Sequence, residues 1–242
     1  EKHPERVLPK EWQDSELRAV AIDQTSAAHP AATAIVGSLA QSVGIPFYGS
    51  RLAVMPDDPA LGEFREAFGG SVGSFDEYIG PGTRDISEVI STFDLWKKWK
   101  EGGSQNRVDA RAFLKARLFD LVVGNWDRHQ AQWRWARFGS EPVWVPLPED
   151  ADQAFTRYEG KAMGAVRRVV PRFMRYSGEY PKRMEGLTTN NYDVTRWLLA
   201  RVEWPVYEEV ARELVAQMTD AAIDQAMHQM PPEWYAIDGA QM

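Results

Sequence analysis

The feature that most constrains this chain is the stretch from residue 109 to residue 155, in which two short acidic turns flank a pair of strand-like segments. A helix-like run at 110–123 ends where the polar turn at 124–129, Gly-Asn-Trp-Asp-Arg-His, begins. The stretch closes on a second turn at 149–152, Glu-Asp-Ala-Asp. Carboxylate oxygens are ligands that Mg²⁺ prefers, and Mg²⁺ also binds phosphates. Two acidic turns joined by a hairpin can therefore hold a metal ion and a phosphate group between them.

Composition excludes several kinds of site. The chain of 242 residues has a formal net charge of −7, which argues against non-specific binding to nucleic acid. It has no cysteine, so disulfides, thiolate catalysis and thiolate zinc sites are excluded, while the cellular compartment stays open. The four histidines lack the close spacing of a zinc-binding helix, so a histidine-rich zinc site is not expected.

The hydropathy of the chain is that of a soluble globular protein. Hydrophobic residues make up 44% and charged residues 26%, and every apolar run is far shorter than a membrane span. The sequence begins Glu-Lys-His-Pro, without a start methionine or the basic and apolar regions of a signal peptide. We therefore expect a mature product, a trimmed chain or a fragment, and an exported or periplasmic location stays open.

Periodicity and turn residues predict the elements of the first 80 residues. A helix is expected where apolar residues repeat every four positions between Pro30, suited to a first helical position, and Gly44, suited to a C-terminal cap. The glycine-rich run at 69–73 precedes a strand, so we interpret it as a hairpin turn and not as a phosphate-binding loop. The other expected elements are a short helical piece at 15–22, strands at 46–55 and 71–79, and an amphipathic turn at 61–68.

Beyond residue 82 the pattern is mainly helical. A helix is predicted from residue 83 because apolar residues share one face at helical spacing, namely Ile86, Val89, Ile90, Phe93 and Trp96. Asp109 is suited to cap the helix that follows. Further helices are expected at 110–123, 161–169, 191–202, 205–218 and 220–227, and strands at 133–138 and 143–147.

The predicted fold is α+β and mainly helical. A small mixed α/β part is expected at residues 1–80, and the Gly-Pro-Gly break at 80–82 marks its boundary. A larger, mainly helical part with one inserted β-hairpin is expected at residues 81–242. The chemistry-bearing turns belong to this second part.

The spacing of polar residues around the hairpin favours phosphoryl transfer. That chemistry needs a carboxylate that accepts or orients a hydroxyl proton, and oxygen ligands that hold Mg²⁺ on the phosphates. A kinase catalytic loop places its base aspartate five residues before an asparagine ligand, and a metal-binding aspartate comes later. Asp127, Gln132 and Asp150 have this order and approximate spacing, with glutamine in place of asparagine.

These motifs resemble those of atypical kinases. The turn at 124–129 is similar to the G-N/D-x-D-R-H loop of the phosphatidylinositol kinases, the secretory-pathway casein-type kinases, the HipA toxin kinases and the CotH spore-coat kinases. Residues 145–155, Val-Pro-Leu-Pro-Glu-Asp-Ala-Asp-Gln-Ala-Phe, resemble their metal-binding P-x-D-x-D-x-x-F segment. With Gln-Trp-Arg-Trp at 132–135, the combination most resembles an uncharacterised bacterial group of HipA/casein-kinase-like proteins. The resemblance extends from residue 25 to about residue 235, and its specific motifs lie within 109–155.

The resemblance implies a protein-kinase-like C-lobe with a reduced or truncated N-lobe. It implies transfer of phosphate from ATP, with Mg²⁺ or Mn²⁺, to a hydroxyl of an unknown protein, lipid or small-molecule acceptor. Asp127 would be the catalytic base, and Arg128 and His129 would brace its loop. The strand at 71–79 resembles the adenine hinge, so Tyr78 and Ile79 would lie against the nucleotide.

The second turn would hold the metal in such a kinase. Asp150 would be the main ligand, and Asp152 would lie close to the metal or the phosphates. Gln132 stands where the second metal ligand belongs, next to the nucleotide phosphates. Its extra methylene moves the amide oxygen relative to that of asparagine.

The short segment before the first helix departs from the pattern of these kinases and keeps other functions open. The Gly-rich loop and the phosphate-pairing lysine of such kinases precede their first helix, but only about 25 residues precede it here, with Lys2 and Lys10 as their lysines. A catalytically inactive pseudokinase, acting as an interaction module, is therefore the first alternative. A metal-dependent phosphohydrolase that uses the same Asp/His cluster is the second.

Single residues also have plainer interpretations. Asp127 alone could cap the turn or pair with Arg128, and His129 could brace the loop instead of binding metal. The tryptophans could stack on bases or sugars, although strand alternation favours core packing; they are Trp126, Trp133, Trp135 and Trp144. A basic run could meet phosphate or form a solvated face; it comprises Arg167, Arg168, Arg172 and Arg175.

Overall fold

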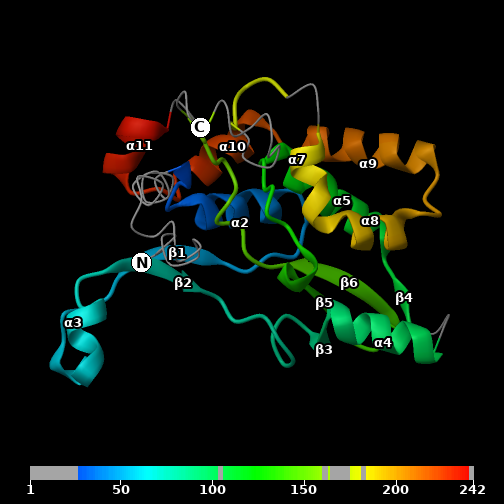
Figure 1. Ribbon diagram of the computed structural model, residues 1–242, viewed down its shortest axis with the longest axis horizontal. Helices are drawn as coiled ribbons and strands as arrows, with labels where there is room; N and C mark the ends of the chain where they lie inside the picture. Colours follow the sequence, from blue (N-terminus) through cyan, green and yellow to red (C-terminus); the bar gives the residue numbers. More distant parts are fainter. Residues whose placement is uncertain (1–26, 103–105, 160–162, 164–174, 181–183, 240–242) are drawn as a thin grey trace, which may run out of the picture.

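The computed structural model describes residues 27–102, 106–159, 163, 175–180 and 184–239 (Figure 1). They form an α+β fold, as the sequence predicts. The strands are arranged in two small β-sheets. Within this described part, no helix is long and apolar enough to cross a membrane. Several expectations fall outside the described residues, namely the helices at 15–22 and 161–169, Lys2, Lys10, Arg167, Arg168 and Arg172.

Helix α2 (Ala32–Ser42) confirms the first predicted helix. Its C-terminus is closed by Gly44, whose φ of 70° lets the amides of Gly44 and Ile45 donate back to carbonyls of the last turn. Pro30 lies before the helix, and Ala31 is the N-cap. The expected glycine cap is therefore present, whereas the expected proline start is wrong.

Two short strands form an isolated sheet after α2. β1 (Ser50–Val54) pairs antiparallel with β2 (Val72–Asp76), so both strands are shorter than the predicted ones. Every residue of β2 is exposed. Residues just outside the strands, such as 45–49, have no regular secondary structure and lead toward the main hydrophobic core.

The connection between β1 and β2 projects away from the rest of the molecule (Figure 1). It consists of η4 (Pro59–Phe64), a 3₁₀ helix, and α3 (Arg65–Phe68), and neither has a buried residue. The expected amphipathic turn is therefore present as a helix but has no partner for its apolar face among the described residues. Phe64 and Phe68 are 58% and 49% exposed.

The predicted helix from residue 83 is wrong at its start. β3 (Ile86–Ser91) is a strand that pairs antiparallel with β5 (Trp133–Phe138), and α4 (Thr92–Gly102) begins only after it. Apolar residues spaced by three and four fit a helix, but the β-branched residues of this segment also favour extended backbone. Pairing with β5 decides between the two.

The predicted hairpin is the centre of a larger sheet. β5 and β6 (Val143–Pro148) pair antiparallel, which confirms the two strands expected after the polar turn. β3 flanks β5, and β4 (Arg107–Val108) runs parallel to β6, so the strand order is β3-β5-β6-β4. The second part of the chain thus contains a four-stranded sheet where a lone hairpin was expected.

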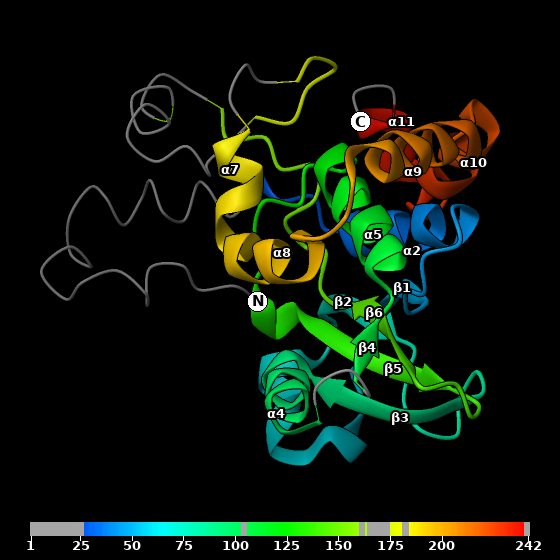
Figure 2. The same cartoon turned by 90° about the vertical axis from the view of Figure 1, so that its right-hand side faces the viewer.

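The helices of the C-terminal half lie on one side of this sheet (Figure 2). α5 (Ala110–Val122) confirms its prediction, and the Asp109 carboxylate caps it by accepting from the Ala112 amide at 2.8 Å. α9 (Trp204–Gln217) confirms the helix expected at 205–218, and α10 (Asp220–Met227) confirms the helix expected at 220–227. The remaining elements are α7 (Glu185–Thr188), η7 (Thr189–Asn191), α8 (Tyr192–Leu199) and α11 (Pro232–Asp238).

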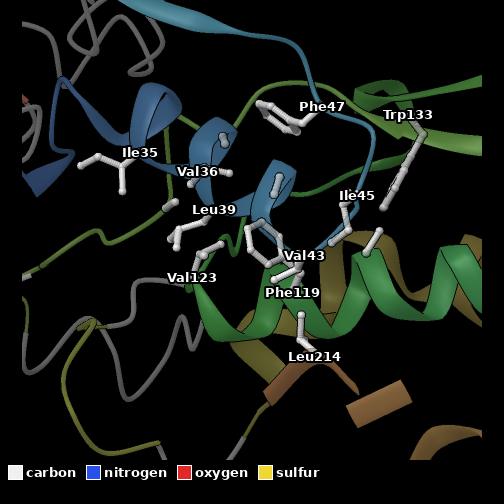
Figure 3. Close-up of a cluster of buried hydrophobic side chains, with 14 of the residues drawn as sticks. Ile35, Val36, Leu39, Val43, Ile45, Phe47, Phe119, Val123, Trp133 and Leu214 are labelled. Carbon is white, nitrogen blue, oxygen red and sulfur yellow. The ribbon is translucent and has the colours of Figure 1, made fainter. Parts of the chain in front are cut away.

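The main core lies where α2 meets α5 and the central sheet. Leu39 of α2 and its C-cap residue Val43 point toward Phe119 of α5 and its C-cap residue Val123 (Figure 3). The strand tryptophans are fully buried, as predicted from their alternation, namely Trp133, Trp135 and Trp144. α5 therefore stands on a rigid base, and the polar turn at its end is positioned by the core.

Candidate active site

The end of α5 fixes the start of the polar turn. Gly124 has a φ of 67°, and its amide donates to the Leu121 carbonyl at 3.3 Å, while the Asn125 amide donates to the Asp120 carbonyl at 2.9 Å. These two bonds form a Schellman cap. A Cβ added at Gly124 would lie 2.8 Å from Cδ2 of Tyr176. Glycine is thus favoured both by the left-handed backbone and by the close approach of Tyr176.

Arg128 connects the two acidic turns. Its side chain is 1% exposed, and its guanidinium donates to the Asp120 carboxylate at 3.0 Å from Nη2 to Oδ1 and 3.1 Å from Nε to Oδ2. Its Nη1 also donates to the main-chain carbonyls of Gln132, at 3.3 Å, and Glu149. Charge-assisted bonds of this kind are strong when buried. One side chain therefore joins α5, the polar turn and the second acidic turn.

The carboxylate of Asp150 is held by both turns. Gln132 Nε2 donates to Asp150 Oδ2 at 3.0 Å, and the Asp152 amide donates to Asp150 Oδ1 at 3.1 Å. Asn125 Nδ2 donates to the Asp150 carbonyl at 3.3 Å. Asp150 has a φ of 53°, a left-handed conformation that aspartate tolerates better than most residues. Three of the predicted site residues, Gln132, Asp150 and Asp152, are thus brought together.

His129 and Gln132 brace the turn between them. His129 Nδ1 accepts from the Ala131 amide at 3.2 Å, and Gln132 Oε1 accepts from the His129 amide at 3.3 Å, so the two form a capping box. This geometry supports the bracing role expected for His129. Gln132 presents its amide nitrogen to Asp150, and its Oε1, the atom that could bind a metal, also accepts from the His129 amide.

Asp127 projects from the same turn toward the C-terminal helices. Its Oδ1 accepts from Asn190 Nδ2 at 3.0 Å. Tyr158 lies nearby and packs edge-on against Trp126, with 6.1 Å between ring centroids. Burial, and then the negative charge of Asp127, raise the pKa of Tyr158 to about 12. Tyr158 therefore stays neutral beside the carboxylate over the physiological range.

A cavity of about 670 Å³ opens beside the second acidic turn. Tyr78 and Ile79, the predicted cofactor-binding residues, line it together with Glu149, the neighbour of Asp150. A cavity of this size falls in the range of small-molecule and cofactor sites. Its walls are formed by Pro46, Tyr48, residues 76–81, residues 89–91, Asp94, Arg134 and residues 147–149.

Tyr48 joins the wall of this cavity to Asp150. Its hydroxyl accepts from the Asp150 amide at 3.1 Å, and its ring stacks on Phe47 with 4.4 Å between centroids. Burial, and then the nearby Asp76, raise the pKa of Tyr48 to about 12. The hydroxyl thus remains protonated and keeps a proton available for a ligand in the cavity.

The segment expected to be the adenine hinge is tied to the chain before β1. Arg84 Nη1 donates to the Phe47 carbonyl at 3.0 Å, and its Nε donates to Glu77 Oε1 at 3.1 Å. Glu77 Oε2 accepts from the Gly49 amide at 3.1 Å. Hydrogen bonds from Arg84 lower the pKa of Glu77. We call this set of contacts the hinge clamp, formed by Arg84, Glu77, Phe47 and Gly49.

The cavity is acidic. Arg134 is the one basic residue among its lining residues, where it pairs with Glu149 at 3.2 Å, and none of these residues is a lysine. Each carboxylate in the lining has a hydrogen-bonding or ionic partner within the chain; they are Asp76, Glu77, Asp94 and Glu149. A polyanionic ligand would therefore need a counter-charge besides Arg134.

The donors near Asp150 suit a hard metal ion that also binds phosphate. The described residues contain no group of three or more His, Asp or Glu side chains that could hold a metal by themselves. Mg²⁺ is usually held by one or two carboxylates together with water and substrate phosphates, so a larger acidic cluster is not needed. Asp150 and Asp152 offer carboxylates two residues apart, which fits that donor set.

Four residues at this site were not found by sequence reasoning. Asp120 could have been found, since an aspartate within a buried helix needs a partner. Tyr48, Tyr158 and Asn190 come from distant segments, and no spacing rule connects them to the turns. Only the folded chain brings them together.

Comparison with solved structures finds similarity to a bacterial protein. This chain is similar to a proinflammatory kinase of Helicobacter pylori, CtkA, with a TM-score of 0.49 and 12% sequence identity over 84% of this chain and 76% of that chain. No family model matches the sequence, and no curated protein matches it.

Proposed function

We propose that the chain is a metal-dependent, kinase-like phosphotransferase that moves the γ-phosphate of ATP to a hydroxyl acceptor. Asp127 acts as the base, and Asp150 with Asp152 holds Mg²⁺ or Mn²⁺. The nucleotide occupies the 670 Å³ cavity, with its base toward Tyr78 and Ile79. On its motifs we place the chain with the HipA/casein-kinase-like group, with residues 1–80 as a reduced N-lobe and 81–242 as the catalytic lobe.

The observation that carries this proposal is the link between the two acidic turns, the second of which lines the cavity through Glu149. Arg128 bonds to the carbonyls of Gln132 and Glu149, and Gln132 bonds to the carboxylate of Asp150. Glu149 lines the cavity that also contains Tyr78. Preorganised charges of this kind are what phosphoryl transfer requires, because its catalysis is mostly positioning and electrostatic stabilisation.

In the proposed reaction the acceptor hydroxyl transfers its proton to a carboxylate oxygen of Asp127 as its oxygen bonds to the γ-phosphorus. The bond from that phosphorus to the bridging oxygen breaks, and ADP leaves with the electron pair. Asn190 Nδ2 donates to Asp127 Oδ1 at 3.0 Å, which holds this carboxylate in place. A bound Mg²⁺ or Mn²⁺ would neutralise charge on the phosphates.

One observation favours the alternative of a pseudokinase that binds partners without transferring phosphate. The lining of the cavity has four carboxylates, one guanidinium and no lysine. A triphosphate without its metal would be repelled by this lining, because unscreened like charges oppose binding. In that case the same fold would bind a nucleotide weakly, or a different ligand.

Thermal unfolding and turnover together separate these functions. ATP with Mn²⁺ should raise the melting temperature of the wild type and of Asp127→Ala, but not of Asp150→Ala, because Asp150 is a proposed metal ligand and Asp127 is not. Formation of ADP should fall about 10²–10⁴-fold in Asp127→Ala. Absence of any shift with nucleotide would refute the phosphotransferase, whereas a shift without turnover in the wild type would identify a pseudokinase.

A further inference from the structure

A second cavity lies at the end of the polar turn, beside His129. It has a volume of about 300 Å³, and it is formed where the loop residues 129–131 face η7 and the first turn of α8, residues 189–194. Figure 2 shows the short helical segment before β5 directly beneath the start of α8. All of its lining residues are among those that the structure describes.

This cavity is connected to the proposed base by a direct contact. Asn190, one of its lining residues, donates from Nδ2 to Asp127 Oδ1 at 3.0 Å. His129, two residues after Asp127, lines the opposite wall. A ligand in the cavity would therefore lie beside the carboxylate that accepts the proton.

The wall that carries Asn190 is fixed in place. Asn191 is 1% exposed, its Oδ1 accepts from Trp133 Nε1 at 3.3 Å, and its Nδ2 donates to Thr195 Oγ1 at 3.3 Å. Trp133 is the first residue of β5 and is fully buried. The cavity is therefore part of the folded framework and does not depend on a surface loop alone.

The lining chemistry selects a class of ligand. Most of the lining side chains are polar groups that can form hydrogen bonds, namely His129, Gln130, Thr189, Asn190, Asn191 and Tyr192. Asp193 carries the one carboxylate, and the lining contains no lysine or arginine. Amide, hydroxyl and carboxylate groups bond well to vicinal hydroxyls. A phosphorylated or carboxylated ligand would meet Asp193 and Asp127 without a counter-charge in the lining.

We propose that this cavity is the acceptor site of the phosphotransferase, and that the acceptor is a neutral polyhydroxylated molecule such as a sugar or a cyclic polyol. The assignment rests on the proposed function. The size supports it, since about 300 Å³ is at the lower end for small-ligand sites and suits one sugar ring. An acceptor hydroxyl next to Asn190 gives its proton to Asp127 while its oxygen takes the γ-phosphoryl group.

Binding without nucleotide provides the first test. Saturation-transfer NMR would be recorded on the full chain with myo-inositol, glucose and sorbitol, each measured beside its monophosphate. We expect binding of at least one neutral polyol, and weaker binding of its monophosphate. Failure of all three neutral polyols to bind would overturn the proposal, and so would equal or tighter binding of the monophosphates. Binding of a serine-containing peptide without binding of any polyol would overturn it as well.

Matched variants locate the bound polyol. Asp193→Asn and Asp220→Asn each remove an exposed carboxylate from the first turn of a helix, but only Asp193 lines the cavity. Asp193→Asn should weaken polyol binding roughly three- to tenfold, the effect of one hydrogen bond, and Asp220→Asn should leave it unchanged. Equal effects of the two substitutions would contradict the site.

Polyol binding by NMR and the thermal shift with ATP and Mn²⁺ together distinguish the acceptor-site proposal from the proposed phosphotransferase function. If neutral polyols bind but ATP with Mn²⁺ causes no thermal shift, the phosphotransferase fails while the polyol site stands. If the nucleotide binds and polyols do not, the acceptor assignment fails while the phosphotransferase stands.

Discussion

The two sides of the 670 Å³ cavity are built in different ways. On the side of the acidic turns, Arg128 and Asp120 are almost fully buried and are joined by several hydrogen bonds. On the side of the hinge, every residue of β2 is exposed, and the hinge clamp connects half-exposed side chains of Arg84 and Glu77. One side is held by the core, and the other by contacts at the surface.

This difference indicates which part of the site is preformed. A buried, fully bonded network is costly to rearrange, whereas a surface ion pair contributes about 0–1 kcal/mol to the free energy of unfolding. The turns that carry Asp127 and Asp150 should therefore keep their geometry without ligand. The hinge side should gain order when a nucleotide binds, because few buried contacts hold it beforehand.

The largest expected effect comes from breaking the buried network. Arg128→Met should lower the free energy of unfolding by about 3–5 kcal/mol, because Asp120 would keep its burial while losing one of its two arginine partners, with Arg117 remaining. Denaturant unfolding measures this. Arg212→Met, at an exposed i,i+4 pair with Glu208, is the control and should change stability by less than about 0.5 kcal/mol. Similar losses in both variants would remove the contrast between the two sides.

The end of α5 provides a smaller effect on the same side. Gly44 and Gly124 both have left-handed φ angles, so Gly44→Ala should cost about 1–2 kcal/mol of unfolding free energy from backbone strain alone. Nothing lies within 4 Å of a Cβ at Gly44, whereas Tyr176 is 2.8 Å from one at Gly124. Gly124→Ala should therefore cost at least about 1 kcal/mol more. Equal costs, measured by denaturant unfolding, would show that Tyr176 does not constrain the turn.

Breaking the hinge clamp should affect nucleotide binding more than stability, in contrast to breaking the buried network around Arg128. Arg84→Met should change the unfolding free energy by less than about 1 kcal/mol, since both partners are partly solvated. It should weaken the binding of ATP with Mn²⁺ roughly three- to tenfold, because the ligand must then order the hinge. Calorimetric titration of the variant beside the wild type gives both the affinity and its enthalpy. A large loss of stability without a change in affinity would place the hinge in the folded framework.

The smallest effect at neutral pH concerns two tyrosines beside the acidic turns. The pKa values of Tyr48 and Tyr158 are raised to about 12, compared with about 10 in an unfolded chain. The stability that their neutral forms contribute is fully present below about pH 10 and is lost as the pH rises toward 12. Burial also raises the pKa of Tyr176 and Tyr180, so tyrosinate absorbance should show Tyr48 and Tyr158 among several late-titrating groups, and Tyr48→Phe and Tyr158→Phe should each remove one. Early titration of both would mean that the site is open to water.

Much of the fold followed from local pattern, and its errors have a common cause. The helices α2 and α5 and the β5–β6 hairpin were predicted because their periodicity and their glycine caps agree. β3 was taken for a helix because its apolar spacing fits both structures, and only its pairing with β5 decides. Contacts between segments that are far apart in the sequence cannot be predicted from a local sequence pattern.

The site divides in the same way. Asp127, Gln132 and Asp150 could be proposed from their spacing, and Arg128 from the resemblance of its turn to kinase loops. The structure brings Arg128, Gln132 and Asp150 into one network. Asn190 lies far along the chain from Asp127, so its hydrogen bond could not be anticipated. The hinge clamp was missed because it depends on a tertiary contact between Arg84 and the Phe47 carbonyl.

The most direct test of the account is calorimetric titration of ATP with Mn²⁺ into the wild type, Asp150→Asn and Asp220→Asn. The account predicts binding to the wild type and to Asp220→Asn with equal affinity, and at least roughly tenfold weaker binding to Asp150→Asn, because the Asp150 carboxylate is a proposed metal ligand that Gln132 and the Asp152 amide hold in place, whereas Asp220 lies outside the site. Equal binding to all three proteins, or binding to none, would contradict the claim that these turns form one nucleotide and metal site.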